Sequence, residues 1–204
     1  MSTDAPRNAV LLDRDGTLNV EVNYLSHPDQ LELLPHTAAG LQRLQAAGWL
    51  LVVITNQSGV GRGYFDEAML VATNERLRSI LRAEGVELDG IYYCPHVPEA
   101  GCLCRKPSTG LVEQAAAELG FDPARAFVIG DKPSDIQLGT NVGAITILVR
   151  TGYGAGHEAR GDTHPDYVVD DLATAAALIL AEGGADRSTH RRPAASPRRP
   201  GKDA

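Results

Sequence analysis

Short apolar runs alternate with longer amphipathic segments along most of the chain. Runs of strand length occupy residues 9–12, 49–54, 90–93, 126–129, 144–149 and 167–169. Segments typical of helices occupy residues 37–47, 66–84 and 109–119, and two more helices are expected from about Pro133 and from Leu172. Continuous apolar strands that alternate with helices are buried on both faces. The pattern therefore predicts a mainly parallel sheet between two helical layers, a Rossmann-like α/β sandwich.

The segment 66–84 carries the clearest helical pattern. Leu70, Leu77 and Leu81 recur at near-helical spacing. Asp66 is of a residue type that caps helix N-termini with its side chain. We therefore expect a helix that begins directly after Asp66.

Polar motifs follow three of the predicted strands. Residues 13–17 read Asp-Arg-Asp-Gly-Thr, residues 55–59 read Thr-Asn-Gln-Ser-Gly, and residues 130–132 read Gly-Asp-Lys. Ligands of parallel α/β sheets bind at the carboxyl ends of the strands. We therefore expect all three motifs at one edge of the sheet, in a single site.

The carboxylates of these motifs suit phosphoryl transfer. Asp13 could take up a phosphoryl group and form an aspartyl-phosphate. Asp15, on the same side of an extended chain, could protonate the leaving oxygen and later deprotonate a water molecule. Carboxylates around a phosphate require a hard cation between them. We expect Mg²⁺, bound by Asp13, Asp131 and the backbone carbonyl of Asp15.

Hydrogen-bond donors and cations for the phosphate oxygens come from other segments. Thr55 and Asn56 offer hydroxyl, amide and backbone N–H groups, and Lys106 offers an ammonium. Arg62 lies in a glycine-rich stretch and could either reach a second phosphate or remain in solvent. Tyr153 and its neighbouring glycines are expected to form a flexible loop.

All three cysteines of the chain lie close together. Cys94 and His96 are followed, after five intervening residues, by Cys102 and Cys104. Three thiolates and one imidazole complete a tetrahedral Zn²⁺ shell and leave no position open for substrate. We therefore expect a structural zinc in a loop at residues 94–104. By clamping this loop, the zinc would also fix the position of Arg105 and Lys106, which follow Cys104.

Composition narrows the class of protein. The net charge of −7 argues against a nucleic-acid-binding protein. The hydrophobic content of 43% is ordinary for a globular protein, and no apolar run approaches the length of a membrane span. Residues 185–204 contain six Lys or Arg and two Asp, lack apolar periodicity and are expected to be a disordered basic tail. We expect one domain over residues 1–184. No secretory signal begins the sequence, so we expect the protein in the cytoplasm. We also expect a monomer.

From about residue 9 to 155 the sequence resembles the haloacid-dehalogenase-type (HAD-type) phosphatases. The resemblance rests on LLDRDGTLNVEVNYL, VVITNQSGVGRGYF, GIYYCPH, CLCRKP, VIGDK and LVRTGYG, in this order. It is greatest to the heptose 1,7-bisphosphate 7-phosphatase branch. That branch implies a phosphorylated sugar substrate, catalytic Mg²⁺, structural Zn²⁺, no separate cap domain and a place in ADP-heptose and lipopolysaccharide precursor synthesis.

The resemblance also implies a role for each matching residue. Asp13 would be the phosphorylated nucleophile, Asp15 the general acid and base, and Thr55 and Lys106 the residues that hold the phosphoryl group. Substrate contacts would come from Glu21, Val22, Asn23, Tyr24, Asn56, Gln57, Ser58, Arg105 and Lys132. Metal ligands would be Asp13, Asp15 and Asp131 for Mg²⁺, and Cys94, His96, Cys102 and Cys104 for Zn²⁺.

Alternative functions stay open at this point. The five-residue spacing in the cysteine loop and the stretch 134–138 resemble histidinol-phosphate phosphatases, whereas residues 59–63 and 150–152 resemble the heptose enzymes. Some polynucleotide end phosphatases share the motif at residues 13–17, but the acidic composition argues against them. A protein of another class, a non-catalytic zinc- and phosphate-binding module, would have no need of Asp15.

Overall fold

The computed structural model describes residues 7–183, and the predicted tail at 185–204 lies outside the described residues. In the described part a single sheet contains β1 (Ala9–Leu12), β2 (Leu50–Asn56), β3 (Gly90–Cys94), β4 (Phe127–Gly130), β5 (Ile145–Val149) and β6 (Tyr167–Val169). Its order is β3-β2-β1-β4-β5-β6, and every neighbouring pair is parallel. The predicted parallel α/β fold is confirmed.

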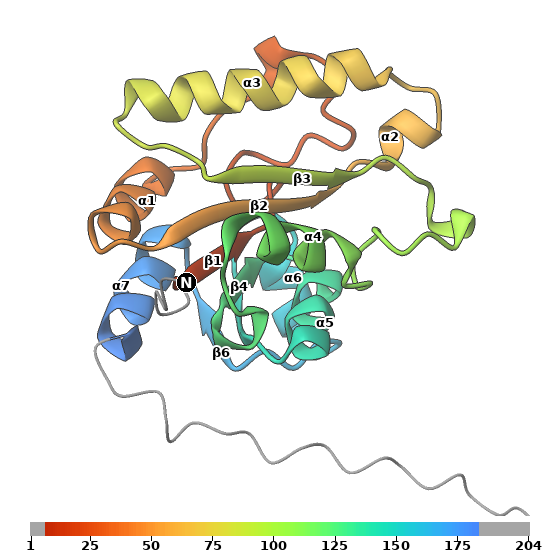
Figure 1. Cartoon of the computed structure of the whole chain (residues 1–204). Helices are drawn as coiled ribbons and strands as arrows, with labels where there is room; N and C mark the ends of the chain where they lie inside the picture. Colours follow the sequence, from red (N-terminus) through yellow and green to blue (C-terminus); the bar gives the residue numbers. More distant parts are fainter. Residues whose placement is uncertain (1–6, 184–204) are drawn as a thin grey trace, which may run out of the picture.

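Helices cover both faces of this sheet (Figure 1). Along β1 successive side chains point to opposite faces. Val10 and Leu12 pack in one apolar core with α1 (Thr37–Ala46), α3 (Glu67–Ala83) and α7 (Leu172–Gly183). Ala9 and Leu11 pack in a second core with α4 (Gly110–Leu119) and α5 (Pro133–Val142). The chain thus forms three layers with β1 near the middle of the sheet.

Helix α3 begins where the sequence predicts. The side chain of Asp66 accepts a hydrogen bond from the backbone N–H of Met69 at 2.8 Å, which confirms Asp66 as the N-cap. Leu70, Leu77 and Leu81 are buried. Asn74 lies in the same buried row and is only 5% exposed.

Several short elements were not predicted. They are α2 (Ser58–Gly61), α6 (Gly154–Arg160), η1 (Pro28–Gln30), η2 (Pro98–Ala100) and η3 (Pro123–Arg125). The expectation of a flexible loop after Tyr153 is wrong, because Gly154 begins α6. A Cβ atom on Gly154 would collide with the carbonyl oxygen of Val149, so this glycine allows α6 to start against the end of β5. Strand β2 runs to Asn56, two residues beyond the predicted end.

No helix of the described residues is long and apolar enough to cross a membrane.

Candidate active site

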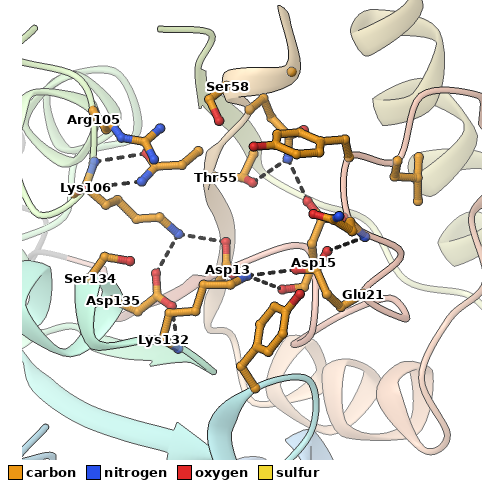
Figure 2. A pocket seen from close by; sticks show the side chains of 17 residues that line it. Asp13, Asp15, Glu21, Thr55, Ser58, Arg105, Lys106, Lys132, Ser134 and Asp135 are labelled. Atoms are coloured by element: carbon orange, nitrogen blue, oxygen red, sulfur yellow. Dashed lines mark hydrogen bonds and ion pairs between the residues drawn. The ribbon is translucent and has the colours of Figure 1, made fainter. Parts of the chain in front are cut away.

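A cavity of about 220 Å³ opens at the carboxyl ends of the central strands (Figure 2). It is lined by Asp13, Asp15, Glu21, Asn23, Tyr24, Leu25, Thr55, Asn56, Gln57, Ser58, Gly59, Arg105, Lys106, Lys132, Ser134, Asp135 and Tyr153. The motifs that follow β1, β2 and β4 therefore meet in one site, as the sequence predicts. The site lies where the strand order reverses beside β1, the usual ligand position of doubly wound sheets.

Lys106 is a buried cation of the cavity lining, paired with Asp13. Its ammonium donates to Asp13 Oδ1 at 2.7 Å and lies 2.7 Å from Asp135 Oδ1 (Figure 2). All three side chains are nearly inaccessible to solvent. Burial alone would lower the pKa of Lys106, but the charges of Asp13 and Asp135 outweigh it and the pKa is raised. Lys106 therefore stays charged beside Asp13.

Asn56 positions this lysine rather than facing a ligand with its side chain. Its amide donates to the carbonyl oxygen of Lys106 at 3.2 Å and accepts from the backbone N–H of Lys106 at 3.0 Å. Both polar groups of the side chain are thus used by one backbone unit. The end of β2 is joined by this pair to the residues that follow the cysteine loop.

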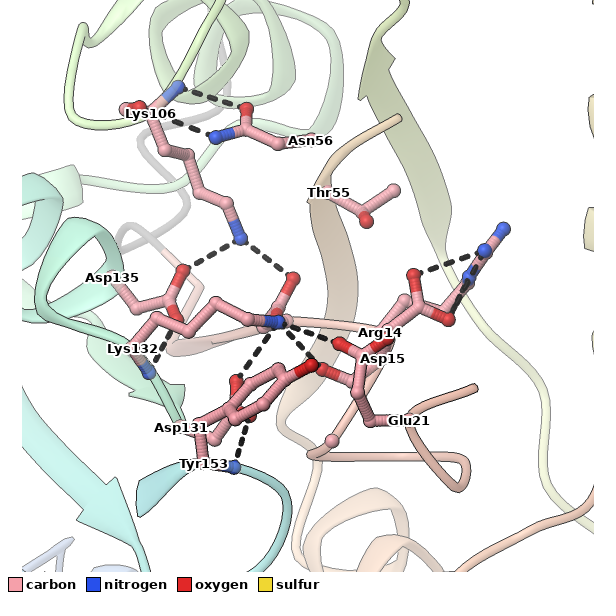
Figure 3. Close-up of polar contacts among 12 residues, drawn as sticks. Arg14, Asp15, Glu21, Thr55, Asn56, Lys106, Asp131, Lys132, Asp135 and Tyr153 are labelled. Atoms are coloured by element: carbon pink, nitrogen blue, oxygen red, sulfur yellow. Dashed lines mark hydrogen bonds and ion pairs between the residues drawn. The ribbon is translucent and has the colours of Figure 1, made fainter. Parts of the chain in front are cut away.

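Asp15 is held by several hydrogen-bond donors, among them its neighbour Arg14 (Figure 3). Arg14 Nη2 lies 3.0 Å from Asp15 Oδ2, and the amides of Gln57 and Asn19 donate to Asp15 at 2.7 and 3.0 Å. Burial alone would raise the pKa of Asp15, but the charge of Arg14 and the hydrogen bonds outweigh it, and the pKa is lowered. Without substrate Asp15 is therefore a carboxylate. Gln57 also donates to the hydroxyl of Thr55 at 2.8 Å.

Lys132 extends across the acidic side of the cavity (Figure 3). Its ammonium lies 2.9 Å from Glu21 Oε2, 3.3 Å from the carbonyl oxygen of Asp15 and 3.4 Å from Asp131 Oδ1. The same ammonium lies 5.3 Å from the ring centroid of Tyr153. Burial opposes the charge of Lys132, yet the surrounding carboxylates raise its pKa above the usual value.

The buried carboxylates can hold a cation. Asp13, Asp131 and Asp135 offer oxygen atoms within 4.8 Å of one another. Asp131 is fully buried, and its Oδ1 has no hydrogen-bond partner among the described residues. Burial, reinforced by the charge of Asp13, raises the pKa of Asp131 to about 7. Cβ atoms on Gly16 or Gly152 would collide with the Asp131 carboxylate, so glycines at both positions leave it room. Such a set of hard oxygen ligands fits Mg²⁺.

The predicted zinc ligands also converge. The three sulfur atoms of Cys94, Cys102 and Cys104 lie 3.2, 3.4 and 3.5 Å apart, and His96 Nδ1 lies 3.2 Å from the Cys104 sulfur. Sulfur ligands on one tetrahedral zinc are roughly 3.7 Å apart, whereas bonded sulfurs are about 2.05 Å apart. The spacing therefore fits a metal shell and excludes a disulfide between any two of these described cysteines.

Some predicted contacts are not at the cavity. Val22 is 41% exposed and is not part of the lining, although its neighbours Glu21 and Asn23 are. Arg62 is exposed at the end of α2 and is also not part of the lining. Arg105 does line the cavity, and its guanidinium donates to the carbonyl oxygen of His96 at 3.2 Å.

The sequence analysis missed Leu25, Gly59 and Ser134 of the cavity lining and four residues with polar roles in the site. These four are Arg14, Asn19, Asp135 and Tyr153. Asp135 had a signal in the sequence, because it stands three residues into a Pro-initiated helix, where an acid accepts from the N-cap backbone N–H. Arg14 had a weaker signal, a charged residue enclosed between two motif aspartates directly after a buried strand.

Comparisons with known proteins point to one family. The model of the HAD-hydrolase-like family matches residues 103–175. D-glycero-beta-D-manno-heptose-1,7-bisphosphate 7-phosphatase of Pasteurella multocida (strain Pm70) is 41% identical over 180 residues, which cover 85% of this chain and 97% of the relative. D-glycero-D-manno-heptose-1,7-bisphosphate 7-phosphatase of Thermosynechococcus vestitus (strain NIES-2133 / IAM M-273 / BP-1) is 40% identical over 188 residues, which cover 85% of this chain and 96% of the relative.

A solved structure supports the same grouping. D,D-heptose 1.7-bisphosphate phosphatase from B. bronchiseptica, complexed with magnesium and phosphate, superposes with a TM-score of 0.81 and 36% identity. The alignment covers 86% of this chain and 99% of that chain. The chain belongs to the HAD-type phosphatases, enzymes that hydrolyse phosphoric monoesters. The relatives and the solved structure named here all carry the name of one branch of that family, the heptose bisphosphate phosphatases.

Proposed function

We propose that this protein hydrolyses the 7-phosphate of D-glycero-D-manno-heptose 1,7-bisphosphate. The observation that carries the proposal is 41% identity, over 85% of the chain, to a relative named for that activity. A polar cavity with two carboxylates of the motif after β1, the buried Lys106 and the half-buried Lys132 supports it. The product, a heptose 1-phosphate, would enter ADP-heptose and lipopolysaccharide precursor synthesis, which we assign to the cytoplasm.

The proposed reaction has two steps. A carboxylate oxygen of Asp13 attacks phosphorus and forms an aspartyl-phosphate, while the bond from phosphorus to the sugar oxygen breaks. Asp15, a carboxylate before substrate binds, first takes up a proton from the monoanionic phosphate of the substrate or from solvent. It gives this proton to the sugar oxygen, and it later takes one from the water whose oxygen attacks phosphorus and releases Asp13 and inorganic phosphate. Lys106, whose ammonium lies 2.7 Å from Asp13, and the hydroxyl of Thr55 hold the equatorial oxygens.

Magnesium is part of this proposal. Asp13, Asp131 and the backbone carbonyl of Asp15 would hold the ion, which supplies positive charge to the phosphate oxygens. Asp135 lies within the same acidic cluster but is paired with Lys106 at 2.7 Å. We therefore assign Asp135 to Lys106 and not to the ion.

A structural zinc in the loop after β3 is the second metal of the proposal. Cys94, His96, Cys102 and Cys104 would bind it with no position open for substrate. The two cations Arg105 and Lys106 follow the last ligand directly. A clamped loop would therefore hold both at the cavity.

Recognition of the sugar and of its second phosphate falls to the cavity rim. We assign this recognition to Arg105, Glu21, Asn23, Tyr24, Gln57, Ser58 and Lys132. The side chain of Val22 is left out because it does not line the cavity. A guanidinium can hold a phosphate through two hydrogen bonds, which suits Arg105 for the phosphate that is not transferred. For Asn56 we propose a supporting role through Lys106.

Steady-state assays of the purified protein test the proposal. Heptose 1,7-bisphosphate, histidinol phosphate and fructose 1,6-bisphosphate would be compared by kcat/KM in the presence of Mg²⁺. We expect the heptose bisphosphate to give the highest value. A preference for histidinol phosphate would overturn the proposed substrate while leaving the phosphatase class intact.

A further inference from the structure

The carboxylate of Asp15 is bound on both oxygens by protein donors. Oδ1 accepts from Arg14 Nε at 3.2 Å and from Asn19 at 3.0 Å, and Oδ2 accepts from Arg14 Nη2 at 3.0 Å and from Gln57 at 2.7 Å. The side chain is 15% exposed and lines the cavity. The orientation in which Asp15 meets a substrate oxygen is therefore set by these donors.

Arg14 is the only donor of this set that is charged. Its side chain is 0% exposed, and it is among the largest fully buried side chains of the described residues. Besides Asp15 it donates to Gln57 Oε1 at 3.0 Å and to Asn74 Oδ1 at 2.9 Å. One guanidinium thus joins the motif after β1, the turn after β2 and helix α3.

Asn74 breaks the apolar pattern of α3. Leu70, Leu77 and Leu81 form the buried row of this helix, and Asn74 fills the place between them where a further leucine would fit the period. A buried amide costs free energy unless it is hydrogen-bonded, and Asn74 Oδ1 has Arg14 Nη1 as a partner. Core packing does not explain an amide at this place, whereas fixing Arg14 does.

We propose that Arg14 and Asn74 are positioning residues that orient Asp15 for proton transfer to the leaving sugar oxygen. This inference rests on the proposed function. Asn74 fixes one end of the guanidinium on α3, and the Nε and Nη2 groups at the other end fix the plane of the Asp15 carboxylate. Without the anchor the guanidinium can rotate, and the carboxylate loses the alignment that a general acid requires.

The leaving group of the substrate separates positioning from a merely structural role. A sugar alkoxide leaves only with a proton, whereas p-nitrophenolate leaves without one. The parameter kcat/KM reports the first step, in which Asp15 acts as the acid. We expect Asn74→Leu, which keeps the branched shape of the side chain and removes the acceptor, to lower kcat/KM for heptose 1,7-bisphosphate by roughly ten- to a hundredfold. We expect kcat/KM for p-nitrophenyl phosphate to fall by less than about threefold.

Three further variants test whether the effect of Asn74→Leu is specific to the positioning of Asp15. Thr73→Val removes a buried hydroxyl from the adjacent position of α3, where it donates to Met69 of the same helix, and should change both substrates equally. In an Asp15→Asn background, Asn74→Leu should have no further effect on the sugar substrate, because the group that it positions is gone. If Asn74→Leu does not fold, Arg14→Lys should give the same substrate-selective loss, because an ammonium lacks the planar fork of donors that reaches Asp15 and Asn74 together.

The outcomes distinguish this inference from the proposed function. Equal losses on the sugar and the aryl phosphate would overturn the positioning role, and so would full additivity of Asn74→Leu with Asp15→Asn. If the wild-type protein does not hydrolyse heptose 1,7-bisphosphate, the proposed function fails. The same comparison would then be made with the alkyl phosphate that the protein does hydrolyse.

Discussion

The ammonium of Lys106 lies 2.7 Å from a carboxylate oxygen of Asp13, and both groups are almost fully buried. Asp135 lies on the other side of the same ammonium, also at 2.7 Å. Breaking a buried ion pair by removing one partner is costly, because an uncompensated charge remains. Lys106→Met should therefore abolish activity and reduce the free energy of unfolding by about 3 kcal/mol.

The structure also predicts a partial rescue of this variant. Asp135→Asn, added to Lys106→Met, removes one of the two carboxylates left without a cation. Urea unfolding should find the double variant more stable than Lys106→Met alone, although still inactive. A double variant of equal or lower stability would mean that Asp135 does not depend on Lys106.

Asp13→Asn tests the nucleophile. The amide is nearly the same shape as the carboxylate but is a poor nucleophile. We expect less than about 1% of the wild-type kcat, equivalent to a loss of roughly 3 kcal/mol of transition-state stabilisation. Circular dichroism should report an unchanged fold. Residual turnover above that level would assign the nucleophile to another residue.

Cys102→Ser tests the zinc shell. Protein purified without chelators should contain one equivalent of Zn²⁺, and the variant should bind it more weakly and melt at a lower temperature. Glu99→Gln, an exposed change in the same loop, should keep its zinc and serves as the control. If elemental analysis finds no zinc in the wild-type protein, the proposed structural zinc is ruled out. Hydrolysis should still require added Mg²⁺, because a closed zinc shell offers no position to substrate.

Arg105→Ala tests recognition of the second phosphate. We expect a higher KM for heptose 1,7-bisphosphate and a loss in kcat/KM of roughly ten- to a thousandfold, or about 1.4–4 kcal/mol. p-Nitrophenyl phosphate, which has no second phosphate, should be affected much less. Since Arg105 also donates to the carbonyl oxygen of His96, the zinc content of the variant must be measured alongside. Equal losses on both substrates would place Arg105 in the chemistry or the loop fold.

Asp171 gives the protein a pH-dependent contribution to stability. Its carboxylate accepts from the backbone N–H of Thr174 at 2.8 Å at the start of α7. Burial raises the pKa of Asp171, but the hydrogen bonds from Thr174 and the charge of His36 outweigh it, and the pKa is lowered. A carboxyl group with a lowered pKa contributes to the free energy of unfolding in full above its unfolded-state pKa. This contribution is lost as the pH falls through the folded-state pKa.

Asp171→Ala should therefore cost about 1 kcal/mol at neutral pH, and the cost should shrink as the pH falls below roughly 4. Asp171→Asn keeps a capping oxygen without the charge, so at neutral pH it should cost less than Asp171→Ala but still lose the contribution of the charge. Thermal melts of the three proteins across this range provide the measurement. A cost for Asp171→Ala that does not change with pH would show that the charge of Asp171 contributes nothing.

The sequence predicted the sheet because local patterns determine it. Each strand is a continuous apolar run, and the polar residues that end β1, β2 and β4 meet at one edge once the strands are parallel. The position of Asp13, Thr55 and Asp131 could therefore be predicted without knowledge of any tertiary contact.

The missed parts depend on contacts between distant residues. Arg14 and Asn74 are 60 positions apart, so no local window relates them. Helix α6 was missed because Gly154 and Gly156 weaken its intrinsic helix propensity. Its position depends instead on packing against the end of β5, where only a glycine fits.

The two hydrogen bonds between the Asn56 side chain and the backbone of Lys106 fix the position of this lysine, whatever the length of the cysteine loop that precedes it. Residues 97–101 include none of the four candidate zinc ligands and do not take part in the two hydrogen bonds with Asn56. They contain the exposed turn η2. Insertions or deletions there can change the length of the loop without moving the lysine ammonium. The length of this loop can therefore evolve independently of the catalytic lysine.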